Sequence, residues 1–212
     1  MPTHDSTFDL DRSTADELFP TETAAPMSVN RLWFLADEAD QRAEQVYHRT
    51  ATTYDGYLER DYATDVPRSR FRTLANRVRR TGAPYGVHTL VTNPAGELLL
   101  VRHDGVDMWV LPGGGIESGE TFPETARREL AEEAGIEAEY DGLAMLNRVT
   151  IESGRYATWG VVPIFRASST APEPTVSDPD DEISAAAWFA PDAMPTDTRR
   201  RKTLSEAVAE LS

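Results

Sequence analysis

Three glutamates lie close together in the stretch RRELAEEAG, which runs from Arg127 to Gly135. Glu129, Glu132 and Glu133 are three and four residues apart, so a helix places them on one face. A half-buried pair of like charges at ~6 Å and an effective dielectric of ~20 costs about 3 kcal/mol. No lysine or arginine lies four residues beyond any of the three glutamates. The pattern therefore predicts a positive charge supplied from elsewhere.

A divalent metal ion is the simplest source of that charge. Ligands that are all carboxylates favour hard ions, Mg²⁺ first and Mn²⁺ second. The glycines from Gly113 to Gly115 precede the acidic stretch and let the backbone approach a ligand closely. Because Mg²⁺ commonly shares its ligands with substrate phosphates, this arrangement indicates metal-assisted attack on a phosphate group. The chain has no cysteine, which excludes thiolate metal sites and cysteine nucleophiles.

The elements that must position these groups follow from the flanking residues. Thr121 and Glu124 match a capping box that starts a helix, and Gly135 suits its end. Apolar runs bounded by turn residues predict strands at 85–91, 97–102, 108–112, 143–152, 158–167 and 184–190. A C-terminal helix is expected at 197–212. Strands and helices mix along the chain without strict alternation.

The N-terminal third has a different pattern. Residues 1–27 are polar and acidic, and we expect a disordered acidic arm. Residues 28–82 are expected to form a small helical extension, with a weaker helical piece around Tyr54, Tyr57 and Leu58. Residues 83–212 then form the main domain.

The helix expected at 67–80 is rich in arginine. Its six arginines are Arg68, Arg70, Arg72, Arg77, Arg79 and Arg80, and it has no acidic residue. One hypothesis is a lid that faces phosphates or nucleic acid. The other, which we favour, is docking against the acidic body of the protein or against a second subunit.

The overall charge limits the partners and the location. The net charge is −15, and Lys202 is the only lysine among 21 basic residues. Such an acidic chain argues against nucleic acid as the main partner. It is typical of salt-accumulating halophiles, the alternative being an ordinary acidic protein from an arginine-biased genome. With no apolar run of eighteen residues and no signal pattern, we expect a cytoplasmic protein without a membrane span.

The stretch from residue 113 to 136, GGGIESGETFPETARRELAEEAGI, resembles the signature of the Nudix hydrolases, the Nudix box. The matching positions are Gly114, Glu120, Arg128, Glu129, Leu130, Glu132, Glu133, Gly135 and Ile136. The resemblance extends across 84–195 and leaves 1–80 outside. It implies a Nudix-type α/β/α sandwich with a mixed sheet. It also implies hydrolysis of a nucleoside diphosphate linked to another group.

The resemblance implies a role for each matching residue. The implied metal ligands are Gly114, through its carbonyl, and Glu129, Glu132 and Glu133. Arg128 would orient a glutamate, and Glu120 would add a carboxylate or steady the loop. One of the three metal-site glutamates, or a nearby loop carboxylate, would deprotonate the attacking water. Glu182 is a candidate for a further carboxylate of the site, with a structural role as the alternative.

The substrate stays open at this point. The candidates for substrate contact are His103, Trp109, Tyr156 and Trp159. For the two tryptophans and Tyr156, packing in the core is the alternative. A nucleoside triphosphate, an oxidised nucleotide, ADP-ribose or a nucleotide sugar would all suit the predicted chemistry. The expected partner is thus a nucleotide-type small molecule. The helical extension resembles N-terminal segments that help some Nudix proteins to dimerise, which implies a homodimer.

Two other functions use the same fold. A non-catalytic module could sense a nucleotide and use residues 28–82 for interactions. That hypothesis is weakened because no carboxylate of the box is lost. An isomerase of prenyl diphosphates is weakened further, since its resemblance would bring a catalytic cysteine.

Overall fold

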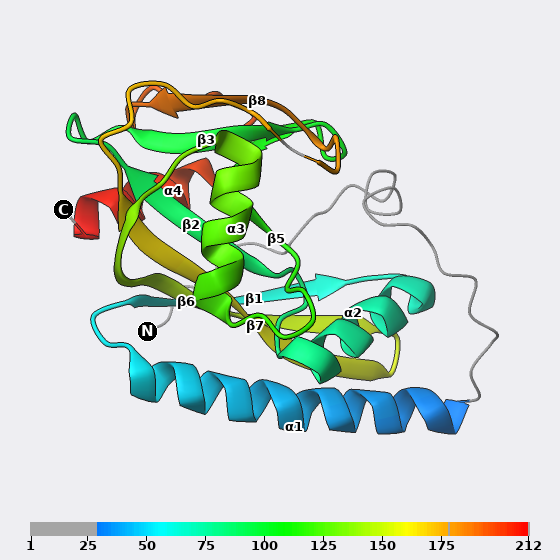
Figure 1. Cartoon of the computed structure of the whole chain (residues 1–212). Helices are drawn as coiled ribbons and strands as arrows, with labels where there is room; N and C mark the ends of the chain where they lie inside the picture. The colour runs from blue at the N-terminus through cyan, green and yellow to red at the C-terminus, as the bar shows by residue number, and fades with distance from the viewer. Residues whose placement is uncertain (1–28, 178, 212) are drawn as a thin grey trace. The chain divides into compact units, whose positions relative to one another are not determined.

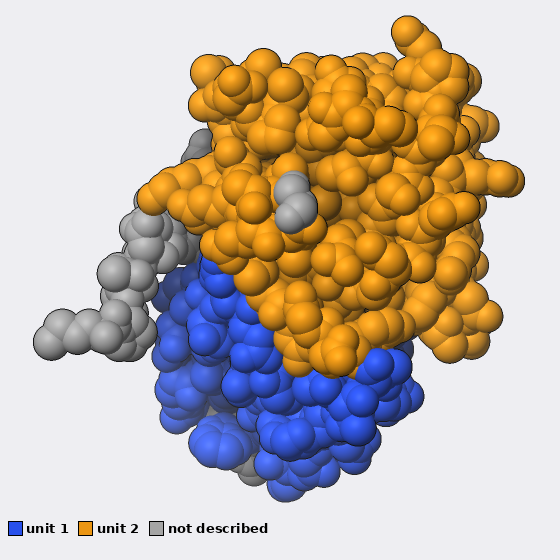
Figure 2. All heavy atoms as spheres, turned by 90° about the vertical axis from the view of Figure 1, so that its left-hand side faces the viewer, with its two compact units in different colours: residues 1–53, 59–85, 147–162 blue, residues 54–58, 86–146, 163–212 orange. Residues whose placement is uncertain are grey.

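The computed structural model describes residues 29–177 and 179–211, so the arm predicted at 1–27 lies outside it. The chain divides into two compact units (Figure 2). The described residues of unit 1 are 29–53, 59–85 and 147–162, and those of unit 2 are 54–58, 86–146, 163–177 and 179–211. The predicted division between residues 82 and 83 stays a prediction.

Unit 2 is built on a mixed sheet. Strand β2 (Val87–Thr92) runs parallel to β7 (Tyr156–Ser168) and antiparallel to β3 (Leu98–His103). Strands β4 (Met108–Val110) and β8 (Ile183–Phe189) both pair with β3. Strand β5 (Gly113–Gly114) pairs with β2, and β6 (Glu139–Ser153) pairs with β7. The sheet thus contains both parallel and antiparallel pairs, which confirms the predicted mixed sheet.

Helices cover both faces of this sheet. Successive side chains of a strand point to opposite faces. Leu98 belongs to the core cluster that includes α4 (Arg201–Leu211), and Leu99 belongs to the cluster that includes α3 (Phe122–Ala134). The two helices therefore lie on opposite sides of the sheet, as Figure 1 also shows. Unit 2 is an α/β/α sandwich, as expected.

Unit 1 contains two helices and a short sheet. Helices α1 (Val29–Thr53) and α2 (Arg68–Thr81) pack against each other, and β1 (Leu58–Asp65) lies beside β6. Gly82 ends α2 with a φ of 84°, and a Cβ there would lie 2.6 Å from Cγ2 of Val46 in α1. The predicted glycine cap therefore also permits close helix packing. Among the described residues, no helix is long and apolar enough to cross a membrane.

The weaker helical piece predicted around Tyr54, Tyr57 and Leu58 is wrong. Helix α1 ends at Thr53, and β1 starts at Leu58. Gly56 between them has a φ of 66°, which breaks the helical path. From Leu58 onward every second residue is at least partly buried, which is the period of a strand.

Candidate active site

Helix α3 carries the acidic face and is capped as predicted. The backbone N and Oγ1 of Thr121 both donate to Oε2 of Glu124 at 2.7 Å, within a capping box. Gly135 ends the helix in the left-handed conformation, and its N donates to the carbonyl of Ala131 at 3.0 Å. Both ends of the helix are therefore held by local contacts, which fixes the direction of its acidic face.

The glycine loop lies between this helix and strand β2. Gly114 of β5 pairs with Val87, and Gly113 adopts a φ of 145°. A Cβ on Gly86 would clash with the carbonyl oxygen of Gly114. A Cβ on Gly114 would lie 2.7 Å from the carboxyl carbon and both oxygens of Glu129. Glycine is therefore required for the close approach of the loop to the acidic helix.

Arg128 lies at the centre of the carboxylate cluster. Its Nε donates to Oε1 of Glu120 at 2.7 Å, and its Nη2 donates to Oε2 of Glu120 at 3.1 Å. Nη2 also donates to the carbonyl of Gly115 at 2.9 Å. Nη1 donates to Oε2 of Glu132 at 2.9 Å and lies 3.0 Å from Oε1 of Glu129. These carboxylates raise the pKa of Arg128 above its ordinary value.

Part of the positive charge that the sequence appeared to lack is thus supplied by Arg128. The resemblance implied only that Arg128 would orient a glutamate. In the structure its guanidinium contacts Glu132, and it also contacts Glu129 and Glu120. Contacts of this kind depend on side-chain directions at adjacent residues, which spacing alone does not specify.

Glu120 accepts four hydrogen bonds. Besides the two from Arg128, Oε2 accepts from the N of Glu117 at 2.9 Å and from Oγ1 of Thr125 at 2.9 Å. The hydrogen bond from Arg128 is the main cause that lowers the pKa of Glu120 to about 2. Two roles were expected for Glu120, a further carboxylate of the site or a residue that steadies the loop. These contacts favour the second role. Thr125 was not predicted, although it lies three residues before Arg128 and so on the same helical face.

Glu133 and Glu129 are the most buried members of the cluster. The Glu133 residue is only 8% exposed, and its Oε2 accepts from the N of Gly113 at 2.7 Å. The side chain of Glu129 is 13% exposed, and this burial raises its pKa to about 7 in spite of Arg128. The negative charges of Glu132 and Glu120 add to the effect. Burial therefore favours the protonated form of Glu129 where no further cation is bound.

The predicted metal ligands do not form one tight group of carboxylates in the part of the chain that the structure describes. Among the described residues, no three histidine, aspartate or glutamate side chains converge closely enough to hold a metal ion. Arg128 instead contacts both Glu129 and Glu132. The donor set still fits a hard divalent cation, because it consists of oxygen atoms and burial penalises the charge on Glu129. The roles of the individual ligands stay predictions.

The other candidates in unit 2 contact one another or the core. Nδ1 of His103 accepts from the N of Gly105 at 3.3 Å, and its Nε2 lies 3.7 Å from Oε2 of Glu182. The ring of Trp109 packs edge-on against Phe189 at 5.0 Å between centroids. The proposed roles of His103, Trp109 and Glu182 at the substrate stay predictions.

Tyr156 and Trp159 belong to unit 1, whereas the carboxylate cluster belongs to unit 2. Tyr156 is buried, with its ring centroid 6.1 Å from that of Phe71. The guanidinium of Arg148 lies 4.5 Å from the centroid of the Trp159 ring. These contacts favour the packing alternative for both aromatic residues, and substrate contact stays a prediction.

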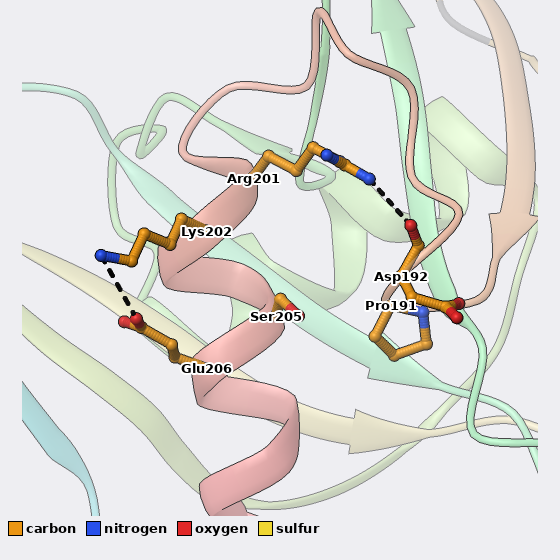
Figure 3. Close-up of a pocket in the computed structure, with 6 residues that line it drawn as sticks. All are labelled: Pro191, Asp192, Arg201, Lys202, Ser205 and Glu206. Atoms are coloured by element: carbon orange, nitrogen blue, oxygen red, sulfur yellow. Dashed lines mark hydrogen bonds and ion pairs between the residues drawn. The ribbon is translucent and has the colours of Figure 1, made fainter.

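One hollow in unit 2 contains none of the predicted site residues (Figure 3). Its lining residues are Pro191, Asp192, Arg201, Lys202, Ser205 and Glu206. Arg201 donates to the carbonyl of Asp192 at 2.8 Å, and Nζ of Lys202 lies 3.9 Å from Glu206. Both cations are thus already engaged by groups of the same surface, so the hollow adds no group to the candidate site.

Comparison with known proteins identifies the family. The family model described as NUDIX domain matches residues 83–210, which is more than half of the chain. The chain therefore belongs to the Nudix family, in agreement with the resemblance of residues 113–136.

Several known proteins are similar to parts of the chain. The mouse (Mus musculus) protein named 8-oxo-dGDP phosphatase NUDT18 is 30% identical over 129 residues, 59% of this chain and 38% of the relative. The RNA pyrophosphohydrolase of Pseudomonas fluorescens (strain SBW25) is 43% identical over 53 residues, 25% of this chain and 33% of the relative. The crystal structure of a MutT NUDIX hydrolase from Burkholderia pseudomallei has 24% identity and a TM-score of 0.43. It covers 60% of this chain and 98% of its own. The chain matches less than two thirds of the length of its curated relatives.

Proposed function

We propose that this protein is a metal-dependent hydrolase that cleaves a pyrophosphate linkage in a nucleoside diphosphate derivative by attack of water. The observation that carries the proposal is the cluster in which Glu120, Glu129 and Glu132 surround Arg128 beside the glycine loop. Burial of like charges is costly for the fold, so a cluster of this kind favours a catalytic function. A module that only senses a nucleotide would not require it.

The proposed metal is Mg²⁺, with Mn²⁺ as the second candidate. The residues that would hold it are Gly114, Glu129, Glu132 and Glu133. When bound, such an ion neutralises phosphate charge and lowers the pKa of a bound water. Arg128 and Glu120 hold the glutamates in place. One of the three glutamates, or a loop carboxylate such as Glu182, accepts the proton of the attacking water.

The proposed substrate is a nucleoside triphosphate, an oxidised nucleotide, ADP-ribose or a nucleotide sugar. The name of the mouse relative supports an oxidised nucleotide as the first to test. The name of the bacterial relative adds RNA as a candidate. The net charge of −15 disfavours a long RNA, because its phosphates would be repelled.

A hydrolysis screen tests the proposal. The purified chain is incubated at high salt with Mg²⁺ or Mn²⁺ and with each substrate class, and the phosphate-containing products are separated. We expect cleavage within the pyrophosphate linkage of at least one class and no cleavage with a chelator present. If every class stays intact with both metals while the chain is folded, the enzymatic proposal fails and nucleotide sensing replaces it.

We also propose that the N-terminal helices form a homodimer. Trp33 and Phe34 on α1 are 62% and 70% exposed, and they are the exposed large apolar side chains of the described residues. The same unit presents exposed acidic residues on α1 and exposed arginines on α2, which suits a self-complementary interface. Sedimentation of the chain and of a Trp33→Ser/Phe34→Ser variant tests this. A wild-type monomer at micromolar concentration would contradict it.

A further inference from the structure

We propose that Thr125 is a positioning residue whose hydroxyl fixes Glu120 and, through Glu120, the guanidinium of Arg128. Its catalytic consequence rests on the function proposed above, but its structural consequence does not. No role was predicted for Thr125 from its position within the Nudix box.

The contacts of Thr125 carry this inference. The residue is fully buried, and its Oγ1 lies 2.9 Å from Oε2 of Glu120. The carbonyl of Thr121 is a second acceptor at 3.2 Å, the usual partner for a threonine inside a helix. One hydroxyl carries one hydrogen, and a carboxylate is the stronger acceptor. The hydroxyl therefore donates to Glu120.

Thr125 is the stiffest donor to Glu120. Arg128 also donates, but its guanidinium sits at the end of a long side chain with several rotatable bonds. Threonine has a single restricted torsion, and burial holds it in place. Glu117 donates from the loop that precedes α3. Thr125 thus links the carboxylate of Glu120 rigidly to the body of the helix that carries the glutamates.

Fixing Glu120 limits where Arg128 can lie. Nε of Arg128 is 2.7 Å from Oε1 of Glu120, while Nη1 of the same planar group contacts Glu129 and Glu132. A rotation of the Glu120 carboxylate therefore moves the contact with both glutamates. The alternative is that Thr125 only fills space in the core.

Two near-isosteric changes separate these alternatives. Thr125→Val keeps the volume and removes the hydroxyl, while Thr125→Ser keeps the hydroxyl and removes a methyl group. We expect Thr125→Val to lower kcat about fivefold at a nearly unchanged KM, and Thr125→Ser to restore most of kcat. If Thr125 only fills space, Thr125→Val should keep the full kcat. Thr125→Ser should then be the less stable variant, because it leaves a gap in the core.

A readout without substrate keeps the test independent of the proposed activity. The Nε–H signal of Arg128 in a ¹⁵N NMR spectrum reports its hydrogen bond to Glu120. We expect this signal to shift or broaden in Thr125→Val and to stay near its wild-type position in Thr125→Ser. Thr73→Val is the control, since the Thr73 hydroxyl bonds to the carbonyl of Ser69 at 3.3 Å within its own helix. It should leave the spectrum of Arg128 and kcat unchanged.

The outcomes are distinguishable. An unmoved Arg128 signal in a folded Thr125→Val variant overturns the positioning role. If the Arg128 signal moves in Thr125→Val but the wild-type chain hydrolyses none of the substrates tested, the positioning role is supported. Only the proposed function is then refuted.

Discussion

At the residue scale, one guanidinium is shared among several carboxylates. Arg128 contacts Glu120, Glu129 and Glu132, and its charge does not balance the three negative charges. Burial is the main cause of the raised pKa of Glu129, and the negative charges of Glu132 and Glu120 add to it. The remaining need for positive charge is the physical reason to expect a metal ion beside these residues.

Glu133→Gln is expected to lower turnover by orders of magnitude while the chain stays folded. Glutamine keeps an oxygen that can accept from the N of Gly113, so the loop contact survives. The lost negative charge weakens the proposed metal site. Initial rates at saturating Mg²⁺ measure the effect. The exposed Glu137→Gln is the matched control, and near-normal turnover of Glu133→Gln would remove Glu133 from the metal ligands.

Metal-free protein should lose stability as the pH rises from about 4.5 to about 7 because of Glu129. Its pKa in the folded chain is raised from 4.5 to about 7, so the folded state binds the proton more tightly than the unfolded state. By linkage, the contribution of Glu129 is at most about 3 kcal/mol and is lost as the pH increases.

Urea unfolding with a chelator present at pH 5 and pH 7.5 measures this. The loss between the two values should be smaller in Glu129→Gln than in the wild type, and Mg²⁺ should reduce it in the wild type. Glu137→Gln serves as the control for the removal of one charge. Equal losses in Glu129→Gln and the wild type would show that Glu129 does not titrate abnormally.

At the element scale, α1 is held on the strands of unit 1 by a polar contact. Oδ1 of Asp40 accepts from Oγ1 of Thr158 at 2.8 Å and from the N of Trp159 at 3.2 Å. Partial burial raises the pKa of Asp40. Apolar residues of both helices, including Leu35 and Phe71, share the same core cluster.

Asp40→Ala should destabilise the protein by about 1–3 kcal/mol, because two donors lose their acceptor. The free energy of unfolding in urea is the measurement. Asp37→Ala is the matched control, since the exposed Asp37 accepts from the exposed Gln41 and acts on Asp40 only through its charge. If both variants lose the same small amount, the contact of Asp40 with β7 does not hold α1.

The arginine-rich helix α2 is part of the same unit. It buries Phe71, Leu74, Ala75 and Val78, and Arg79 contacts Glu38 of α1 at 3.2 Å. This contact favours docking of the helix over a phosphate-binding lid. Removing residues 1–82 would expose the core residues that β6 and β7 contribute, so point variants test this region better than truncation.

At the scale of the whole molecule, the net charge of −15 should make stability depend on salt. Self-repulsion destabilises a folded chain in dilute buffer, and ~1 M salt shortens the screening length to about 3 Å. The thermal midpoint should rise steeply between low salt and molar KCl. Sucrose, which adds no ions, is the control. A flat dependence on KCl would remove the halophile hypothesis and leave the enzymatic proposal intact. A cytoplasmic location also stays a prediction.

The sequence by itself determined the local features of the site. The capping residues, the glycine loop and the spacing of Glu129, Glu132 and Glu133 all depend on neighbours within a few positions, and the structure contains each of them. The mixed sheet with helices on both faces was implied by the resemblance of residues 113–136 to the Nudix box, whereas apolar periodicity indicated the separate strands and helices.

Tertiary structure alone decided how the side chains share their charges. The four hydrogen bonds of Glu120, the buried hydroxyl of Thr125 and the hydrogen bond from Gly113 to Glu133 depend on how the loop closes over the helix. The strand β1 was missed for a similar reason, since its partner β6 lies far away in the sequence. Local periodicity cannot report contacts between distant segments, whereas packing and hydrogen bonding in the folded chain select them.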